Sequence, residues 1–253
     1  MFLADGVHVN GLTQVLWGPD HTILDKTAEV MVGGRVALAL TRGRHRKRYA
    51  YTDPNEDVVA AVTDSNRLML VVADGHHGKE SSVVAVQALV DLARAGLPER
   101  VDSDRAVELF LRLNDKVVEE ISSPLCPNPQ SRTTLAVALL TGAQLSWASL
   151  GDSSVFARHG ELTIRLDQAR RDRFLGERYS RRRMASSMSS GTVQLGAGDH
   201  VYVASDGYTD FAANPLAWRG ADGAAPDEIA RDGVQRAAEG GAGDNVAVGV
   251  VRV

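Results

Sequence analysis

Hydrophobic positions gather into short runs along this chain, and the run at residues 68–73 is apolar at every position. A strand that is apolar on both faces lies inside a core. The run stops at Asp74, Gly75 and His76, where glycine allows a sharp turn. Asp and Gly are also ordinary turn residues, so this motif alone does not establish a site. The pattern predicts a buried strand that carries Asp74 to the rim of the core.

Further apolar runs predict strands at residues 35–41, 58–63, 134–141, 144–150, 153–158, 162–166, 200–205 and 246–253. Helical spacing of apolar residues predicts one helix at 81–95 and another that begins near residue 103. Pro226 favours a third helix start, because proline is preferred in a first helical turn. The order of strands, then helices, then strands favours antiparallel sheets covered by helices over a doubly wound parallel sheet.

Three segments do not fit this pattern. Residues 1–34 are interrupted by Gly and Asp, and we expect them to be an N-terminal extension that packs on a domain spanning residues 35–253. Residues 42–48 form a basic run, for which a solvated loop is favoured over a phosphate or nucleic-acid contact. Residues 167–190 are rich in Arg and poor in β-branched residues, so we expect an exposed insertion. None of these segments divides the chain, so the sequence predicts a single domain.

Composition excludes several classes of protein. The 253 residues are 44% hydrophobic and 24% charged, which is typical of a globular domain. The net charge of −4 gives no overall nucleic-acid signature. Cys126 is the only cysteine, so an intramolecular disulfide is excluded, and nothing in the sequence suggests zinc ligation by thiolates. No secretory signal pattern and no apolar run near the ~18 residues of a membrane span occurs, so we expect a cytoplasmic protein without membrane partners.

Acidic residues recur at the ends of the predicted strands. The set comprises Glu56, Asp57, Asp74, Asp152, Asp206, Asp210 and Asp244. Each one alone is better explained as a turn residue than as a ligand. If the strand ends meet, however, these carboxylates cannot all be ionised side by side without a cation. Oxygen ligands select Mg²⁺ or Mn²⁺ over zinc, and Asp74, on the most buried strand, is the natural bridge of a two-metal site.

In these acids and the residues around them, the chain resembles the metal-dependent serine/threonine protein phosphatases of the PPM, or type 2C, class. The matching motifs are Asn55-Glu56-Asp57, Ala73-Asp74-Gly75-His76-His77-Gly78, Ser131-Arg132-Thr133-Thr134, Leu150-Gly151-Asp152-Ser153, Ala204-Ser205-Asp206-Gly207-Tyr208-Thr209-Asp210 and Asp244-Asn245. Each motif alone is weak evidence of the resemblance, but six motifs in the family's order are strong evidence. The resemblance implies a bacterial-like, single-domain member with a four-layer α-β-β-α sandwich of the α+β class, built from two antiparallel sheets flanked by helices.

The resemblance also implies roles for the acids. Asp74, Asp206 and Asp244 would hold one metal ion. Glu56, Asp74 and the carbonyl of Gly75 would hold a second, and Asp152 and Asp210, with Asp206, would offer a weaker third site. The ions would be Mg²⁺ or Mn²⁺. A phosphorylated protein would be the substrate, hydrolysed at phosphoserine or phosphothreonine.

Two further residues would act directly in the reaction. Asp57 would orient the metal-bridging water. His76 would donate a proton to the leaving alkoxide, for which an acid with a pKa near neutrality is suited. A loop histidine without chemistry is the alternative for His76.

The chain departs from the family's pattern where an arginine usually binds phosphate, since Thr52 stands there. Arg48 or Arg46 of the basic run could substitute, and so could Arg132. Residues 167–190 stand where the family has its flap, and we expect them to govern substrate choice. A catalytically weak binding or regulatory module is the main alternative function. A nucleic-acid-binding role is disfavoured, because aromatic residues are sparse in both Arg-rich stretches.

Overall fold

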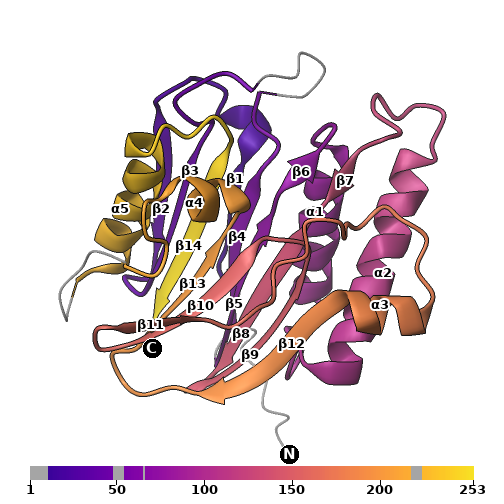
Figure 1. Cartoon of the computed structure of the whole chain (residues 1–253). Helices are drawn as coiled ribbons and strands as arrows, with labels where there is room; N and C mark the ends of the chain where they lie inside the picture. Colours follow the sequence, from indigo (N-terminus) through magenta and orange to yellow (C-terminus); the bar gives the residue numbers. More distant parts are fainter. Residues whose placement is uncertain (1–10, 48–53, 65, 218–223) are drawn as a thin grey trace, which may run out of the picture.

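Two six-stranded antiparallel sheets stack face to face in the computed structural model, which describes residues 11–47, 54–64, 66–217 and 224–253 (Figure 1). The first sheet has the order β1 (Thr13–Trp17), β4 (Val58–Thr63), β5 (Arg67–Ala73), β8 (Leu135–Thr141), β9 (Gln144–Leu150), β12 (Met188–Gln194). The second has the order β11 (Leu162–Arg165), β10 (Ser154–His159), β13 (His200–Ala204), β14 (Val246–Arg252), β3 (Val36–Thr41), β2 (Thr27–Val32). A small third sheet pairs β6 (Gly75–His76) with β7 (Arg132–Thr133).

Helices cover the outer face of each sheet. Helices α1 (Glu80–Arg94) and α2 (Ser103–Ile121) lie on the first sheet, and α4 (Asp206–Phe211) and α5 (Pro226–Glu239) lie on the second (Figure 1). The layers run helix, sheet, sheet, helix. This arrangement confirms the α+β sandwich expected from the sequence. Among the helices of the described ranges, none combines the length and the apolar character needed to cross a membrane.

Strand β5 lies in the middle of the molecule, and its position requires a fully apolar sequence. Leu70 and Val72 face the second sheet, while Met69 and Val71 face α1 and α2. Both faces are therefore buried, and no position of the strand's second half can be polar without losing hydration. The strand is held on one side by β4 and on the other by β8, with Val58 opposite Ala73. Asp74 follows from this rigid, central element.

The described part of residues 1–34 supplies an edge strand to each sheet. Strand β1 pairs with β4, and β2 pairs with β3. Alternate residues of β2 are exposed, as is usual for an edge strand, and this leaves no continuous apolar run in the sequence. The assignment of residues 1–34 as an extension of a domain beginning at residue 35 stays a prediction.

The expectation of an exposed insertion at residues 167–190 is wrong for part of the segment, although residues 168–172 and 180–183 are exposed. Leu175 and Met184 are fully buried, and α3 (Arg181–Ser187) packs on α2. Strand β12 begins at Met188 and pairs with β9 along its whole length. The sequence does not reveal this strand, because it is half-exposed and rich in Ser and Gly, and it depends on backbone pairing instead of apolar side chains.

Candidate metal centre

The acids at the strand ends converge at one end of the sandwich. Antiparallel pairing places the start of β4 beside the end of β5, and the start of β14 near the end of β13. Residues just before or after these strand ends are therefore brought together. They are Glu56, Asp57, Asp74, Asp206 and Asp244. The four aspartates are close enough to influence one another's ionisation, and Glu56 acts with them on Lys47.

Burial makes this cluster electrostatically costly. Glu56, Asp57 and Asp74 are each at most 3% exposed. Burial raises the pKa of Asp74 well above its usual value, and the neighbouring acids raise it further. Burial likewise raises the pKa of Asp57 to about 8 and that of Asp206 to about 7. A cation within the cluster would relieve both the desolvation and the repulsion of the ionised carboxylates.

Some carboxylate oxygens of the cluster are available to a metal ion. Asp74 Oδ2 and Asp152 Oδ1 are buried and have no hydrogen-bond partner within the described ranges. One ligand atom each from Asp74, His76 and Asp152 can be chosen so that all three lie within 4.8 Å of one another. Buried oxygen donors of this kind fit Mg²⁺ or Mn²⁺, so the donor set is compatible with the expected ions.

Hydrogen bonds fix the backbone and side chain of Glu56. Its Oε1 accepts from the amide of Gly78 at 2.7 Å, and its carbonyl accepts from Ser82 Oγ at 2.6 Å. Its own amide donates to Asn245 Oδ1 at 2.9 Å, which ties the first sheet to the second. A Cβ at Gly75 would lie 2.8 Å from the Cβ of Glu56, so only glycine lets the two segments approach this closely.

Lys47 is a functional candidate that the sequence analysis missed. Its Nζ lies 3.1 Å from Glu56 Oε2 and 2.8 Å from Asp244 Oδ1. Burial disfavours its charge, but the attraction of Asp244, Glu56 and other acids outweighs this and raises its pKa above the ordinary value. The interpretation of the basic run as a solvated loop is therefore wrong for Lys47. Nothing in the spacing of the run distinguished this lysine from its neighbours.

The other predicted phosphate-binding cations have different surroundings. Arg46 is exposed, and Arg48 lies outside the described residues, as does Thr52. Arg132 Nη1 donates to the carbonyls of Pro129 at 3.3 Å and Ser131 at 2.6 Å. These bonds occupy Arg132 with its own loop, and its role as a substrate contact stays a prediction.

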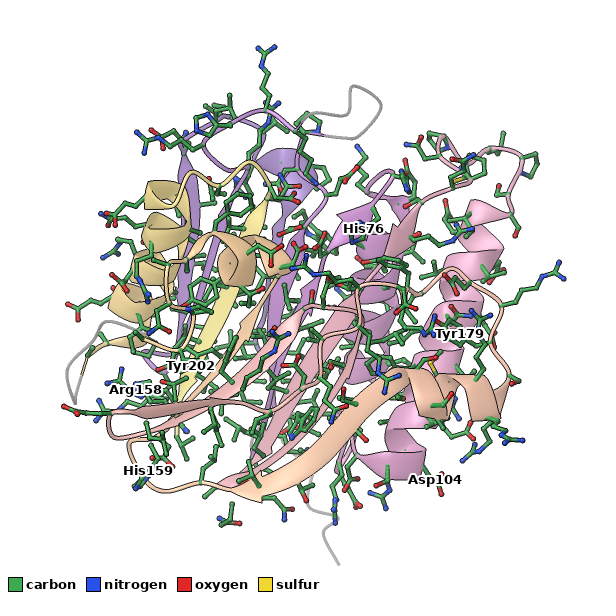
Figure 2. The ribbon with its side chains drawn as sticks, in the orientation of Figure 1. His76, Asp104, Arg158, His159, Tyr179 and Tyr202 are labelled. Atoms are coloured by element: carbon green, nitrogen blue, oxygen red, sulfur yellow. The ribbon has the colours of Figure 1, made fainter. Side chains whose placement is uncertain are left out.

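His76 lies beside the acids at the rim of the sandwich (Figure 2). Its Nε2 is buried, has no hydrogen-bond partner within the described ranges, and lies 3.9 Å from Asp74 Oδ1. Burial lowers the pKa of His76 to about 4, and Lys47 contributes to the same effect. The geometry brings this ring to the cluster, although its predicted role as proton donor is not tested by the structure.

Asp152 and Asp210, expected at a third metal position, both approach an arginine. Arg171 pairs with Asp210 through Nη2, and its Nε lies 3.9 Å from Asp152 Oδ2. Asp210 is one helical turn after Asp206 on α4, so both carboxylates project from one face of that helix. A guanidinium from residues 167–190 thus already neutralises part of this acid pair.

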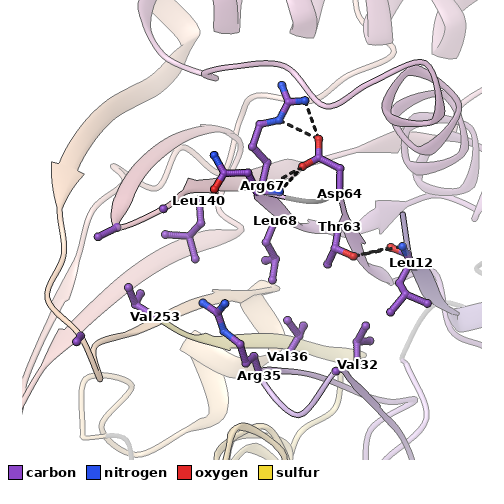
Figure 3. Close-up of a pocket in the computed structure, with 15 residues that line it drawn as sticks. Leu12, Val32, Arg35, Val36, Thr63, Asp64, Arg67, Leu68, Leu140 and Val253 are labelled. Carbon is purple, nitrogen blue, oxygen red and sulfur yellow. Dashed lines mark hydrogen bonds and ion pairs between the residues drawn. The ribbon is translucent and has the colours of Figure 1, made fainter. Parts of the chain in front are cut away.

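A separate pocket lies at the opposite end of the two sheets (Figure 3). It has a volume of about 420 Å³ and is lined by Val36, Leu68 and Val253 among others. Asp64 is the acid in its lining, and it pairs with Arg67 at 2.7 Å. As far as the structure describes the chain, none of the predicted site residues lines this pocket.

A family model describing protein phosphatase 2C matches residues 44–231, which is more than half of the chain. This protein belongs to the protein phosphatase 2C family. The match covers the 2C motifs from the basic run to α5, including most of the acid cluster, and confirms the resemblance seen in the sequence. No curated protein matches the whole sequence closely enough to count as a relative.

Solved structures share the phosphatase 2C fold of this chain. The serine/threonine phosphatase PstP of Mycobacterium tuberculosis is 20% identical with a TM-score of 0.67, and the match covers 87% of this chain and 98% of that one. The PstP catalytic domain solved with two manganese ions is also 20% identical, with a TM-score of 0.68 and coverage of 90% and 99%. PppA of Pseudomonas aeruginosa is 20% identical, with a TM-score of 0.63 and coverage of 90% and 98%. At these identities the likeness establishes the fold.

Proposed function

We propose that this protein hydrolyses phosphoserine and phosphothreonine in other proteins and that the acid cluster holds Mg²⁺ or Mn²⁺ for this reaction. Membership of the protein phosphatase 2C family supports the reaction class. The observation that carries the assignment to this site is the convergence of buried carboxylates from both sheets at one end of the sandwich. The manganese ions of the PstP structure belong to that protein and support the same metal class here.

We infer two metal positions, with the ligand sets that the family resemblance implies. Asp74, Asp206 and Asp244 would hold one ion, and Glu56, Asp74 and the carbonyl of Gly75 would hold the other. Bound metal ions supply a nucleophilic water near neutral pH and neutralise phosphoryl oxygens. Phosphate monoester hydrolysis is among the slowest uncatalysed reactions, so this charge neutralisation matters. A third position at Asp152 and Asp210 would require Arg171 to leave them.

The remaining residues act on protons and on the substrate. Asp57, buried beside the metal ligands, would accept a hydrogen bond from the attacking water and orient it. His76 would donate a proton to the serine or threonine oxygen as the phosphorus–oxygen bond breaks. Its lowered pKa describes the protein without substrate, and a phosphoryl dianion nearby would favour the protonated ring. Lys47 would contact the phosphoryl group, because its ammonium already reaches Glu56 and Asp244.

Hydrolysis of a phosphopeptide panel with and without Mn²⁺ tests this proposal. We expect metal-dependent release of phosphate from phosphoserine and phosphothreonine peptides, and loss of that release in Asp206→Asn. Asp104→Asn is the matched control, because Asp104 is an exposed residue of α2 far along the chain from the acid motifs. Metal-independent release, or full activity in Asp206→Asn, would contradict the assignment.

A catalytically weak binding module is the alternative. It predicts no metal-dependent hydrolysis even of p-nitrophenyl phosphate, a substrate whose leaving group needs no proton. The complete set of acids argues against this alternative, since a module without chemistry has no need for several buried carboxylates in one cluster.

A further inference from the structure

The segment at residues 167–190 is joined to β7, the strand that pairs with the His76 strand β6. The amide of Leu175 donates to the carbonyl of Thr133 at 2.7 Å, and the amide of Thr133 donates back to Leu175 at 3.2 Å. Thr133 lies on β7, whose pairing with β6 places Arg132 opposite His76. Thr133 Oγ1 also donates to the carbonyl of Asp74 at 2.9 Å. The segment therefore shares a hydrogen-bonded frame with the metal centre.

Helix α2 anchors the same segment from the other side. Asn114 Oδ1 accepts from the amide of Gly176 at 2.9 Å, and Asn114 Nδ2 donates to the carbonyl of Glu177 at 2.9 Å. Asn114 is 3% exposed and Leu175 is fully buried. Gly176 has a φ of +98°, which permits the turn between these contacts. Residues 174–177 are thus fixed from two directions, unlike an unattached surface loop.

This anchoring brings the ring of Phe174 against the ring of His76. The centroids lie 4.6 Å apart with an interplanar angle of 64°, an edge-to-face arrangement favoured by aromatic quadrupoles. His76 Nε2 has no hydrogen-bond partner within the described ranges, and its 3.9 Å separation from Asp74 Oδ1 exceeds hydrogen-bonding distance. Within the described ranges, therefore, the ring of His76 has an aromatic contact but no hydrogen bond at Nε2.

We propose that Phe174 is a positioning residue for His76, holding the imidazole so that Nε2 points at the acid cluster where the leaving oxygen of the substrate must lie. This inference rests on the proposed function, and it gives the Arg-rich segment a part in the proton transfer. The segment would then act in chemistry as well as in substrate choice. Loss of the ring would leave His76 free to adopt other rotamers, and proton donation would become slower.

Nuclear magnetic resonance of the His76 ring protons with Mg²⁺, which is diamagnetic, tests the contact without any assay of activity. Phe174→Leu removes the ring current and should shift those resonances toward positions of an unstacked histidine. Phe174→Tyr keeps the ring and should restore them. Tyr179→Leu is the matched control from the same segment, because Tyr179 stacks on Arg183, with the guanidinium 4.8 Å from the ring centroid. Unchanged His76 resonances in Phe174→Leu would overturn the proposal.

Leaving-group dependence tests the consequence for catalysis. General acid catalysis is worth roughly 10²–10⁴-fold, so partial misplacement of the acid should cost about 10-fold in turnover of a phosphoserine peptide. The loss for p-nitrophenyl phosphate should be smaller, because nitrophenolate departs without a proton. Phe174→Leu should add no further loss in a His76→Ala background, and Phe174→Tyr should recover turnover.

Equal losses on both substrates, or additive losses in the double variant, would show that Phe174 acts other than through His76 and would overturn the proposal. Failure of the proposed function gives a different result, because the unmodified protein would then hydrolyse neither substrate with metal. The resonance measurement would still decide whether Phe174 contacts His76 in solution.

Discussion

Single residues determine how several buried carboxylates coexist at one end of this molecule. Lys47 places a cation between Glu56 and Asp244, and Arg171 places another beside Asp152 and Asp210. Among the described salt bridges, no lysine or arginine lies within 4 Å of Asp74. Its titratable neighbour there is the His76 ring, at 3.9 Å. Burial and the neighbouring acids raise the pKa of Asp74 well above its usual value, which agrees with its place as the bridging ligand of the proposed metal pair.

The raised pKa values predict a pH-dependent stability for the metal-free protein. Asp57 rises from 3.8 to about 8 and Asp206 from 3.8 to about 7 in the folded chain. An acid with a higher pKa in the folded state binds protons more tightly there, so the free energy of unfolding falls as pH rises from the unfolded to the folded value. With a chelator present, we expect the melting temperature to fall between about pH 5 and about pH 8.

Mn²⁺ should oppose this loss, and more strongly at the higher pH, because only deprotonated carboxylates bind the ion. Thermal melts with and without Mn²⁺ at each pH measure both effects. Asp57→Asn should flatten the pH dependence of the metal-free melts, while Asp104→Asn should not. A melting temperature that does not depend on pH in this range would contradict the electrostatic account.

Replacement of Lys47 tests its proposed contact with the phosphoryl group. Lys47→Met keeps the length of the side chain and removes its charge. We therefore expect the KM for p-nitrophenyl phosphate to rise and inhibition by inorganic phosphate to weaken. Each change should be about 10-fold, which corresponds to the loss of one charge-assisted hydrogen bond. Arg44→Met, at an exposed residue of the same run that is not a candidate phosphate contact, is the control and should leave both values unchanged. Calorimetry with Mn²⁺ must show retained metal binding in Lys47→Met. Unchanged phosphate inhibition would remove Lys47 from the substrate site.

At the scale of elements, the apolar pattern predicted the central strands well, because these are buried on both faces. The predicted bounds of β5, β8, β9 and β13 lie within a residue or two of those in the structure, and α1, α2 and α5 begin where expected. Edge strands β1, β2 and β12 were missed, since each depends on one neighbour for its hydrogen bonds and shows alternate or weak burial.

The site residues, like the strands, were predictable only where they adjoin buried central strands. Acids that follow directly from buried strands could be named from the sequence, because a central strand fixes where its end lies. Lys47 and Phe174 could not, since each reaches the centre from a segment without regular spacing, and only the fold brings it there. Metal ligation by the named acids and the roles of Asp57 and His76 stay predictions, as does the control of substrate choice by residues 167–190.

The close approach of Gly75 on β6 to Glu56, two residues before β4, gives an element-scale prediction. Gly75→Ala would place a Cβ 2.8 Å from the Cβ and from the carbonyl oxygen of Glu56, so the two segments must move apart. We expect Mn²⁺ affinity to fall by about 10–100-fold, as for disturbed support of metal ligands. Gly196→Ala is the matched control, because its Cβ would come no closer than 3.5 Å to another residue, at Asp199 Oδ2, and Asp199 is not part of the acid cluster. Calorimetric Mn²⁺ affinity equal to that of the unmodified protein would show that the approach of these segments does not support the site.

At the scale of the whole molecule, the two ends of the sandwich differ in their residues. One end collects acids from both sheets together with His76 and Lys47, while the other holds the pocket of Figure 3 with a paired Asp64. The apolar layers between the sheets and beneath the helices keep the strands rigid, so that loops at the first end can differ without displacing the acids. This division agrees with a family fold shared at low sequence identity.

The central claim is that the acid cluster binds the divalent ions on which phosphate hydrolysis depends. The most direct test is a calorimetric titration of Mn²⁺ into the unmodified protein and into Asp74→Asn. Phosphopeptide hydrolysis is assayed on the same samples. Asn keeps the shape of Asp74 and removes its charge, so we predict that saturable Mn²⁺ binding and hydrolysis are lost together while circular dichroism shows a retained fold. Tight Mn²⁺ binding with full hydrolysis in Asp74→Asn would contradict the claim.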